Sequence, residues 1–305
     1  MMETTEKIPK VSVCVMTYNQ DKYIHQCLQS IVDQKTDFDF EVIVGDDCST
    51  DNTRAIIENF AKNYPNQIVP IYHAKNTGIV GNYLAVHRRA QGEYVCHVDG
   101  DDWISPEKLT KQAAYLDNFS KCPLVAHQMT IWNSEKIVGF TRLNPESIDL
   151  SLLLRKHPLF LHSSIMYRRS QVGPVFSNDF FFIDFYVYIS AALKGPLGFL
   201  NLTLGNYREN IGISSSRNLI PNIEDAINLA AREIGETADV LRGRSKQYLS
   251  HSLSSLRNND TNQFKNLLSS AIKADKFWIM PRLIAIASIS PNTLKRLLLL
   301  YRKLR

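Results

Sequence analysis

The sequence predicts an α/β fold in which a mostly parallel sheet is flanked by helices and is followed by an all-helical C-terminal extension. Strand-like and helix-like patterns alternate through the first hundred residues, and no convincing strand pattern follows about Ser216. The chain has 305 residues, of which 44% are hydrophobic and 21% are charged, so it is long enough to bury a large core. We therefore expect two domains, at residues 1–215 and 216–305.

The alternation in the first hundred residues indicates successive strand–helix–strand units, which build a parallel sheet. Short apolar runs predict four strands, and the segments between them have helical periodicity. The expected strands are Val11–Met16, Glu41–Val44, Ile68–His73 and Tyr94–Val98, and the expected helices are Tyr23–Val32, Asp51–Tyr64 and Asn82–Ala90. This order is typical of a Rossmann-like sheet.

After Trp103 the pattern becomes a mixture that suits a parallel sheet extended by antiparallel strands. The expected helices are Pro106–Phe119, Ile148–Arg155 and Phe181–Lys194, and the expected strands are Leu124–Trp132, Lys136–Thr141, Ser163–Tyr167 and Leu197–Leu202. The C-terminal region is expected to form several helices. Their expected breaks are Gly243, Asn258-Asn259, Pro281 and Pro291.

Charge and cysteine content limit the class of protein. The formal net charge is +5, and seven basic residues with no acidic residue lie from Lys276 onward, so the rest of the chain is slightly acidic. We therefore expect no nucleic-acid-binding core. The five cysteines have no CxxC spacing, which indicates reduced side chains in the cytoplasm. The polar N-terminus predicts no secretory signal, and no apolar run predicts a membrane-spanning helix.

Polar segments follow four of the predicted strands. The carboxyl ends of parallel strands meet at one edge of a sheet, where ligands bind. We therefore expect these four loops to form one ligand site. The loops contain, in chain order, Thr17, Tyr18 and Asn19, then Asp46 and Asp47, then Asn76 and Gly78, and finally Asp99 to Asp102.

The loop after the fourth strand carries three carboxylates, at Asp99, Asp101 and Asp102, around Gly100. Burying like charges together costs free energy unless a cation or hydrogen bonds compensate them. Oxygen-only ligands favour Mg²⁺ or Mn²⁺, so Asp99, Asp101 and Asp102 are candidate metal ligands. A solvated acidic turn that caps the helix beginning near Pro106 explains the same pattern.

The segments Val11–Asn19, Val42–Thr53 and Gly92–Asp102 occur in this order and at this spacing, each at the end of a predicted strand. Together they resemble the family 2 glycosyltransferases of the GT-A fold. The resemblance covers roughly residues 8–215 and does not extend into the helical tail. It implies a GT-A domain that binds a nucleotide sugar and catalyses transfer of the sugar.

The resemblance also implies roles for residues at this edge. Asp47 would accept the N3–H of a uracil ring, Asp101 would bind the metal that bridges the donor diphosphate, and Asp99 would contact ribose or metal-bound water. Asp102 would be a metal ligand or support one. Turn chemistry and helix capping are the alternatives for these residues. The further residues expected around the donor are Thr17, Tyr18, Asn19, Asn76, Gly78 and Gly100.

An inverting transfer also needs a base that takes the proton of the acceptor hydroxyl, and Asp184 is the candidate. Its apolar surroundings in Phe181–Phe185 would desolvate the carboxylate and raise its pKa. Relatives usually have Glu-Asp at this point, whereas this chain has Ile183, so only Asp184 matches. A helix N-terminal carboxylate stabilised by the dipole is the alternative.

Two weaker sites accompany these residues. Arg208 is expected either to pair with the diphosphate or to form a surface ion pair, and Asn210 stands where many relatives have a histidine. His162 and Ser163 lie where an acceptor pocket is expected, although a single histidine before a strand is more often structural.

The C-terminal tail predicts a basic amphipathic helix, because apolar and basic residues recur on different faces. Peripheral contact with an anionic membrane surface would explain this pattern, and so would docking on the chain's own domain or on a subunit. The apolar residues are Leu294, Leu297, Leu298, Tyr301 and Leu304, and the basic residues are Lys295, Arg296, Arg302 and Lys303.

These patterns predict a cytoplasmic, Mn²⁺- or Mg²⁺-dependent inverting glycosyltransferase, with a UDP-linked donor and a glycan or glycolipid acceptor in surface polysaccharide synthesis. A sugar-phosphate nucleotidyltransferase is one alternative, but it would need a glycine-rich, arginine-containing loop that Met16–Gln20 does not provide. A catalytically silent nucleotide-sugar-binding module is the other, and Ile183 and Asn210 leave room for it. No motif specifies the donor sugar, the linkage or the oligomeric state.

Overall fold

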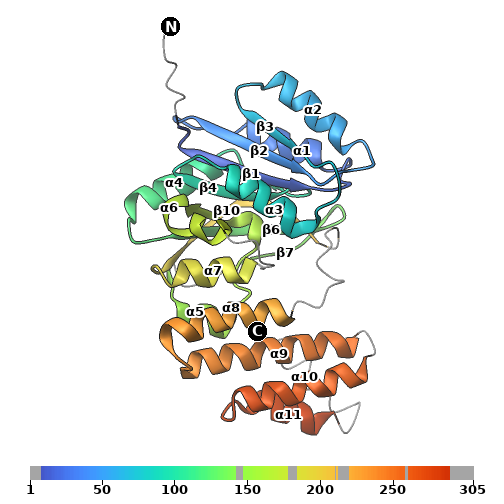
Figure 1. Ribbon diagram of the computed structural model, residues 1–305, viewed down its shortest axis with the longest axis vertical. Helices are drawn as coiled ribbons and strands as arrows, with labels where there is room; N and C mark the ends of the chain where they lie inside the picture. The colour runs from blue at the N-terminus through green and yellow to red at the C-terminus, as the bar shows by residue number, and fades with distance from the viewer. Residues whose placement is uncertain are drawn as a thin grey trace. The chain divides into compact units, whose positions relative to one another are not determined.

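The computed structural model describes residues 8–141, 147–177, 184–209, 211, 220–257 and 260–288. The chain divides into two compact units. The first comprises Met1–Leu153 with His157–Arg217, and the second comprises Leu154–Lys156 with Asn218–Arg305. The first unit contains the sheet, and the second is helical throughout its described part (Figure 1).

The strands form one sheet in the order β3-β2-β1-β4-β9-β6-β10-β5, with β7 beside β6 and β8 beside β10. Neighbours from β3 to β4 are parallel. β9 is antiparallel to both β4 and β6, so β6 and its parallel neighbour β10 run in the same direction as the first four strands. The prediction of a mostly parallel sheet flanked by helices is confirmed. The strands are β1 Val11–Thr17, β2 Phe40–Asp46, β3 Ile68–Tyr72, β4 Tyr94–Asp99, β5 Trp103–Ile104, β6 Leu124–Asn133, β7 Lys136–Phe140, β8 Ser147–Ile148, β9 Met166–Arg168 and β10 Leu197–Arg208.

Helices cover both faces of the parallel strands, which explains why β1 is buried along nearly its whole length. Val11, Val13 and Val15 belong to a hydrophobic cluster shared with α1, α2 and α4. On the opposite face, the Cys14 Sγ lies 3.4 Å from the Val86 carbonyl oxygen of α3. The helices of this unit are α1 Ile24–Val32, α2 Thr53–Asn63, α3 Gly78–Arg89, α4 Lys108–Asn118, α6 Arg169–Val172 and α7 Asp184–Ala192. Helix α5, Leu150–Lys156, begins in the first unit, and its residues from Leu154 onward belong to the second.

Two strands of the second half differ from the prediction. The segment expected as a strand at Ser163–Tyr167 begins as a 3₁₀ turn at His162–Ser164, and β9 forms only after it. The Lys108 Nζ donates to the Ser163 carbonyl oxygen at 2.6 Å, so a side chain satisfies a group that a strand would have paired. β10 continues beyond the expected end at Leu202, because its second half pairs with β6 and β5.

The second unit contains α8 Ile220–Ile234, α9 Ala238–Arg257, α10 Thr261–Ala274 and α11 Ile279–Ala287. The expected break at Gly243 is wrong, because α9 continues through it. A Cβ at Gly243 would lie 3.2 Å from the Leu154 carbonyl oxygen, so the glycine allows close packing instead. Pro281 lies in the first turn of α11, where proline is tolerated. Asn258-Asn259 and Pro291 lie outside the described residues.

No helix in the described ranges is long and apolar enough to cross a bilayer. The predicted amphipathic segment from Leu294 to Leu304 lies outside the described residues.

Candidate active site

The predicted loops meet at the carboxyl edge of the sheet because β1 lies between β2 and β4. Adjacent strands are about 4.8 Å apart, so the ends of β2 and β4 are separated by about 10 Å. Asp47 directly follows β2, and Asp99 is the last residue of β4. The residues predicted for the base and for the diphosphate therefore lie on one edge, at a separation that a single nucleoside diphosphate can span.

Asp47 fastens the second loop to the third. Its side chain is only 4% exposed. Its carboxylate accepts hydrogen bonds from the Thr77 N (2.6 Å), the Thr77 Oγ1 (2.7 Å) and the Gly78 N (2.8 Å). These donors stand at the beginning of α3, so Asp47 caps that helix and not the one after Asp51. A carboxylate offers about four acceptor positions, which leaves room for a donor from a base.

The third loop is completed by Asn76 and Gly78. The Asn76 Oδ1 also accepts from the Gly78 N, at 3.0 Å. Gly78 has φ +76°, a conformation that favours glycine. The two predicted residues thus shape the loop that Asp47 holds.

The first loop joins the second through Asn19. Its backbone has φ +52°, its N donates to the Ser49 Oγ at 2.9 Å, and its Oδ1 accepts from the Thr50 N at 2.8 Å. Thr17 is buried, whereas Asn19 is exposed and Tyr18 is half-buried. Tyr18 and Asn19 are therefore the members of this predicted trio that a ligand can reach most easily.

The acidic turn after β4 packs closely against β1. The Gly100 N donates to the Met16 carbonyl oxygen at 2.9 Å, and a Cβ at Gly100 would lie 2.8 Å from that oxygen. This close approach requires glycine. Asp101 is 6% exposed and Asp102 is fully buried. The Asp102 Oδ1 accepts from the Arg208 N at 2.9 Å, but its Oδ2 has no hydrogen-bond partner among the described residues.

Burial and mutual repulsion act on the carboxyls of this turn. Burial, together with the charge of Asp99, raises the pKa of Asp101 to about 6. Burial and the charges of Asp99 and Asp101 raise the pKa of Asp102 well above its usual range. For Asp99, burial opposes ionisation, but the interaction with His97, which includes a hydrogen bond, outweighs it and lowers the pKa to about 2. The turn therefore holds one readily ionised carboxylate and two that favour a compensating positive charge.

The chemistry of this turn fits a divalent cation. Its donors are oxygens, and one buried carboxylate oxygen of Asp102 lacks a partner in the described part of the chain. No group of three or more His, Cys, Asp or Glu side chains within the described ranges could hold a metal ion. Mg²⁺ and similar ions at phosphate sites typically use only one or two carboxylates together with phosphate oxygens. A cation here would accordingly need oxygens from a ligand as well as from Asp99, Asp101 or Asp102.

Arg208 stands beside the acidic turn at the end of β10. Its Cζ lies 4.3 Å from the ring centroid of Trp103 and 4.8 Å from that of Tyr23. The guanidinium donates to the Asp101 carbonyl oxygen and to the Gln26 side chain. Burial lowers the pKa of Arg208, against the attraction of the neighbouring carboxylates. Ring contacts, which the sequence pattern did not indicate, hold this cation beside the turn.

Asp184 is the first residue of α7. Its side chain is exposed, yet the surrounding protein atoms desolvate the carboxyl and, with the charge of Asp99, raise its pKa. This influence of Asp99 places the two carboxylates within electrostatic range of one another. The apolar segment predicted before it, Phe181–Ile183, lies outside the described residues, as does Asn210.

The sequence pattern did not indicate that buried histidines form a chain of hydrogen bonds that ends on Asp99. His97 Nε2 lies 3.1 Å from Asp99 Oδ1, His87 Nε2 lies 3.1 Å from His97 Nδ1, and the Tyr167 hydroxyl lies 2.7 Å from His87 Nδ1. The Ser163 Oγ donates to Asp99 Oδ2 at 3.2 Å. Histidines inside apolar segments were the only signal in the sequence.

The structure also places His162, which was considered for an acceptor pocket. Its Nδ1 lies 2.7 Å from the Tyr188 hydroxyl and its Nε2 lies 3.0 Å from the Tyr83 hydroxyl. Burial lowers its pKa well below the usual range. His162 is therefore held in place by two hydrogen bonds to tyrosine hydroxyls.

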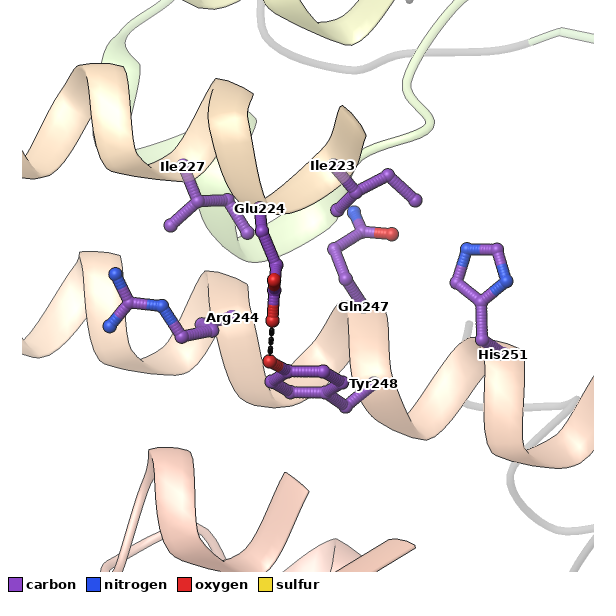
Figure 2. Close-up of a pocket in the computed structure, with 7 residues that line it drawn as sticks. All are labelled: Ile223, Glu224, Ile227, Arg244, Gln247, Tyr248 and His251. Carbon is purple, nitrogen blue, oxygen red and sulfur yellow. Dashed lines mark hydrogen bonds between the residues drawn. The ribbon is translucent and has the colours of Figure 1, made fainter. Parts of the chain in front are cut away.

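A small pocket lies between α8 and α9 of the helical unit (Figure 2). Across it, the Tyr248 hydroxyl donates to the Glu224 carboxylate. Arg244, which also lines the pocket, pairs with Glu236 at 2.8 Å. None of the residues predicted for the donor site lines it. The lining residues are Ile223, Glu224, Ile227, Arg244, Gln247, Tyr248 and His251.

Comparison with known proteins agrees with the sequence pattern. Residues 12–181 match the family model for Glycosyl transferase family 2. An uncharacterised protein of Mycobacterium tuberculosis is 32% identical over 204 residues, which cover 66% of this chain and 59% of that protein. The chain thus spans less than two thirds of the length of the first curated relatives it matches.

Solved structures share the fold. The crystal structure of residues 1–349 of Staphylococcus aureus TarS in complex with UDP-GlcNAc has a TM-score of 0.68 at 23% identity, covering 96% of this chain and 92% of that chain. The mannosyltransferase PcManGT from Pyrobaculum calidifontis, in complex with GDP-Man and Mn²⁺, has a TM-score of 0.55 at 16% identity, covering 96% and 86%. The family model spans more than half of this chain, and the GT-A fold is the one that the resemblance implied. The chain therefore belongs to glycosyl transferase family 2.

Proposed function

We propose that this chain is an inverting, metal-dependent glycosyltransferase that moves a sugar from a UDP-linked donor to a glycan or glycolipid acceptor in surface polysaccharide synthesis. The observation that carries the proposal is the position of Asp47 and of the Asp99–Asp102 turn on the two sides of β1. A donor lying across β1 would have its base at the second loop and its diphosphate at the fourth. Complexes of TarS with UDP-GlcNAc and of PcManGT with GDP-Man and Mn²⁺ support this choice of ligand.

In this proposal, different residues of the chain bind different parts of the donor. Asp47 has acceptor capacity for a base N–H, while Tyr18 and Asn19 are accessible beside it. Asp101, with Asp99 or Asp102, would hold Mn²⁺ or Mg²⁺, which when bound neutralises charge on the leaving diphosphate. Arg208 adds a fixed positive charge next to this turn.

Asp184 is proposed as the general base. Desolvation raises the pKa of its carboxyl, which makes the ionised form a stronger proton acceptor. An exposed position at the beginning of α7 lets an acceptor hydroxyl approach. In the proposed step Asp184 takes the proton of that hydroxyl while the hydroxyl oxygen attacks the anomeric carbon from the side opposite the diphosphate. The bond between the anomeric carbon and the diphosphate oxygen breaks, and the nucleoside diphosphate leaves.

The test is a panel of UDP-, GDP- and dTDP-linked sugars, with Mn²⁺ and with release of nucleoside diphosphate as the readout. We expect Asp184→Asn to lower turnover by about 10²- to 10⁴-fold while UDP binding is retained. Asp101→Asn should instead weaken Mn²⁺-dependent UDP binding. Asp33→Asn, which changes an exposed carboxylate at the C-terminal end of α1, is the matched control.

The same panel separates the rival functions. Wild-type protein that binds UDP with Mn²⁺ but neither transfers nor hydrolyses any donor would support a catalytically silent binding module. Normal turnover by Asp184→Asn would remove Asp184 from the base role. Wild-type protein that binds no nucleotide would contradict the donor site itself.

We also propose that the enzyme works at the cytoplasmic face of the membrane, through the basic residues of its tail. A basic amphipathic helix gains about 1 kcal/mol per Lys or Arg near an anionic surface. Changing Lys295, Arg296, Arg302 and Lys303 to Glu should abolish co-sedimentation with phosphatidylserine vesicles, and so should truncation after Pro291. Undiminished binding by both variants would contradict this location, and neutral vesicles provide the control.

A further inference from the structure

The Tyr167–His87–His97 chain runs through the interior to the back of Asp99. We propose that it is a positioning relay, in which the three side chains act in series to hold the Asp99 carboxylate in the orientation that donor binding requires. This inference rests on the proposed function, because it assigns a purpose to the surroundings of the same site. It concerns positioning residues and not groups that touch the substrate.

Three separate elements supply the members of the relay. Tyr167 comes from β9, His87 from α3 and His97 from β4, and all three side chains are buried. β4 pairs with β9, and α3 contributes His87 to the same interior. The hydrogen bonds measure 2.7 Å from Tyr167 to His87, 3.1 Å from His87 to His97 and 3.1 Å from His97 to Asp99.

With both imidazole rings neutral, one arrangement of protons satisfies every bond of the relay. The Tyr167 hydroxyl donates to His87 Nδ1, His87 Nε2–H donates to His97 Nδ1, and His97 Nε2–H donates to Asp99 Oδ1. We assign these tautomers from the bonding pattern. Each ring nitrogen is used once, so replacing His87 by an apolar residue leaves the His97 Nδ1 buried and without this donor.

Packing prevents the imidazole rings from turning away. The His87 ring stacks on Tyr83 with centroids 3.9 Å apart and an interplanar angle of 16°. It also lies 5.3 Å from the His97 ring at 19°. His162 packs 4.2 Å from His97 on another side and is itself bonded to two tyrosine hydroxyls. The relay is therefore rigid as well as hydrogen-bonded.

The relay contacts Asp99 from the protein interior and leaves part of its carboxylate accessible. His97 donates to the Asp99 Oδ1, and the Ser163 Oγ donates to the Asp99 Oδ2 and accepts from the Asp99 N at 3.0 Å. The carboxylate side chain nevertheless remains 35% exposed. A hydrogen-bond network that served only the core would have no need to end on an accessible carboxylate at the edge of the site. Residues behind metal-binding groups commonly change metal affinity or activity by 10- to 100-fold when they are replaced.

The first test measures the Mn²⁺ concentration that half-saturates UDP binding to the full chain. His87 is linked to Asp99 through His97. We expect His87→Phe to raise the half-saturating Mn²⁺ concentration by about tenfold. His97→Leu should have at least the same effect, and His97→Gln a smaller one, because an amide N–H can still donate. His127→Phe is the matched control, since His127 is a fully buried histidine of β6 whose ring bonds to the Gln128 carbonyl oxygen. It should leave the Mn²⁺ requirement unchanged.

The second test needs no ligand. Long-range ¹H–¹⁵N NMR spectra of the histidine rings should show the Nε2–H tautomer for His87 and His97 in wild-type protein, and His87→Phe should alter the His97 signals. An Nδ1–H tautomer at His97 would overturn the relay. So would equal Mn²⁺ requirements for His87→Phe and His127→Phe. Should wild-type protein fail to bind UDP, the donor site would be refuted, while the NMR result would still decide the hydrogen-bond chain.

Discussion

Asp47 and the Asp99–Asp102 turn lie on the same edge of the sheet, but the chain treats their negative charges in opposite ways. Asp47 receives three hydrogen bonds at 2.6 to 2.8 Å from the beginning of α3. In the acidic turn, burial and the repulsion of neighbouring carboxylates raise the pKa of Asp101 and Asp102. The comparison teaches that the protein alone compensates the negative charge at the base end of the site, whereas the stability of the diphosphate end depends on what binds there.

The largest effect on the free energy of unfolding is expected at Asp47, at the base end of the site. Asp47→Ala removes the three charge-assisted hydrogen bonds that join the buried Asp47 carboxylate to Thr77 and Gly78 at the beginning of α3, which should cost about 3 kcal/mol of unfolding free energy. Urea unfolding in EDTA measures this. Asp37→Ala removes an exposed carboxylate of the same unit and should stay within about 0.5 kcal/mol of wild type. Equal stability of the two variants would show that the bonds to Asp47 do not hold the loops.

Intermediate losses of stability are expected when alanine replaces Gly100 in the acidic turn or Gly78 at the beginning of α3. At Gly100 a Cβ would lie 2.8 Å from the backbone oxygen of Met16, so Gly100→Ala should cost about 2 kcal/mol or more. At Gly78 a Cβ would meet open space, and Gly78→Ala should cost only about 1 kcal/mol, because its φ of +76° disfavours alanine. Chemical denaturation of the two variants gives the order directly. The reverse order would mean that backbone strain, and not close packing, limits the acidic turn.

The sequence was sufficient to predict both loops, because strand ends, turn residues and carboxylates are local features. It identified Asp47, Asn76, Gly78 and the acidic turn, and the parallel order of the strands implied that they meet. It did not show that Asp47 binds the beginning of α3, since those donors lie 30 residues away. Local pattern also cannot tell a capping carboxylate from one that awaits a ligand, because the two differ only in their three-dimensional partners.

The histidine chain could not be predicted from the sequence, because it too depends on partners that are far apart in the sequence. His87 and Tyr167 are 80 residues apart, and His97 joins them only after β4, β9 and α3 have packed. In the sequence each histidine looks like an isolated polar residue in an apolar segment. Gly243 shows the opposite error, since a local rule predicts a helix break that packing against Leu154 overrides.

The smallest effect, and the one of opposite sign, is expected for Asp102→Asn. Asparagine keeps an oxygen for the bond from the Arg208 N and resembles the protonated acid that burial favours, so it removes a charge that opposes folding. In EDTA we expect the variant to unfold at the same urea concentration as wild type or slightly higher, a gain of at most about 1 kcal/mol. Added Mn²⁺ and UDP should raise the melting temperature of wild type more than that of the variant, because ligand binding stabilises only the folded state that can hold it. A clear loss of stability in EDTA would mean that Asp102, like Asp47, is satisfied by the protein itself, and the contrast between the two ends of the site would disappear.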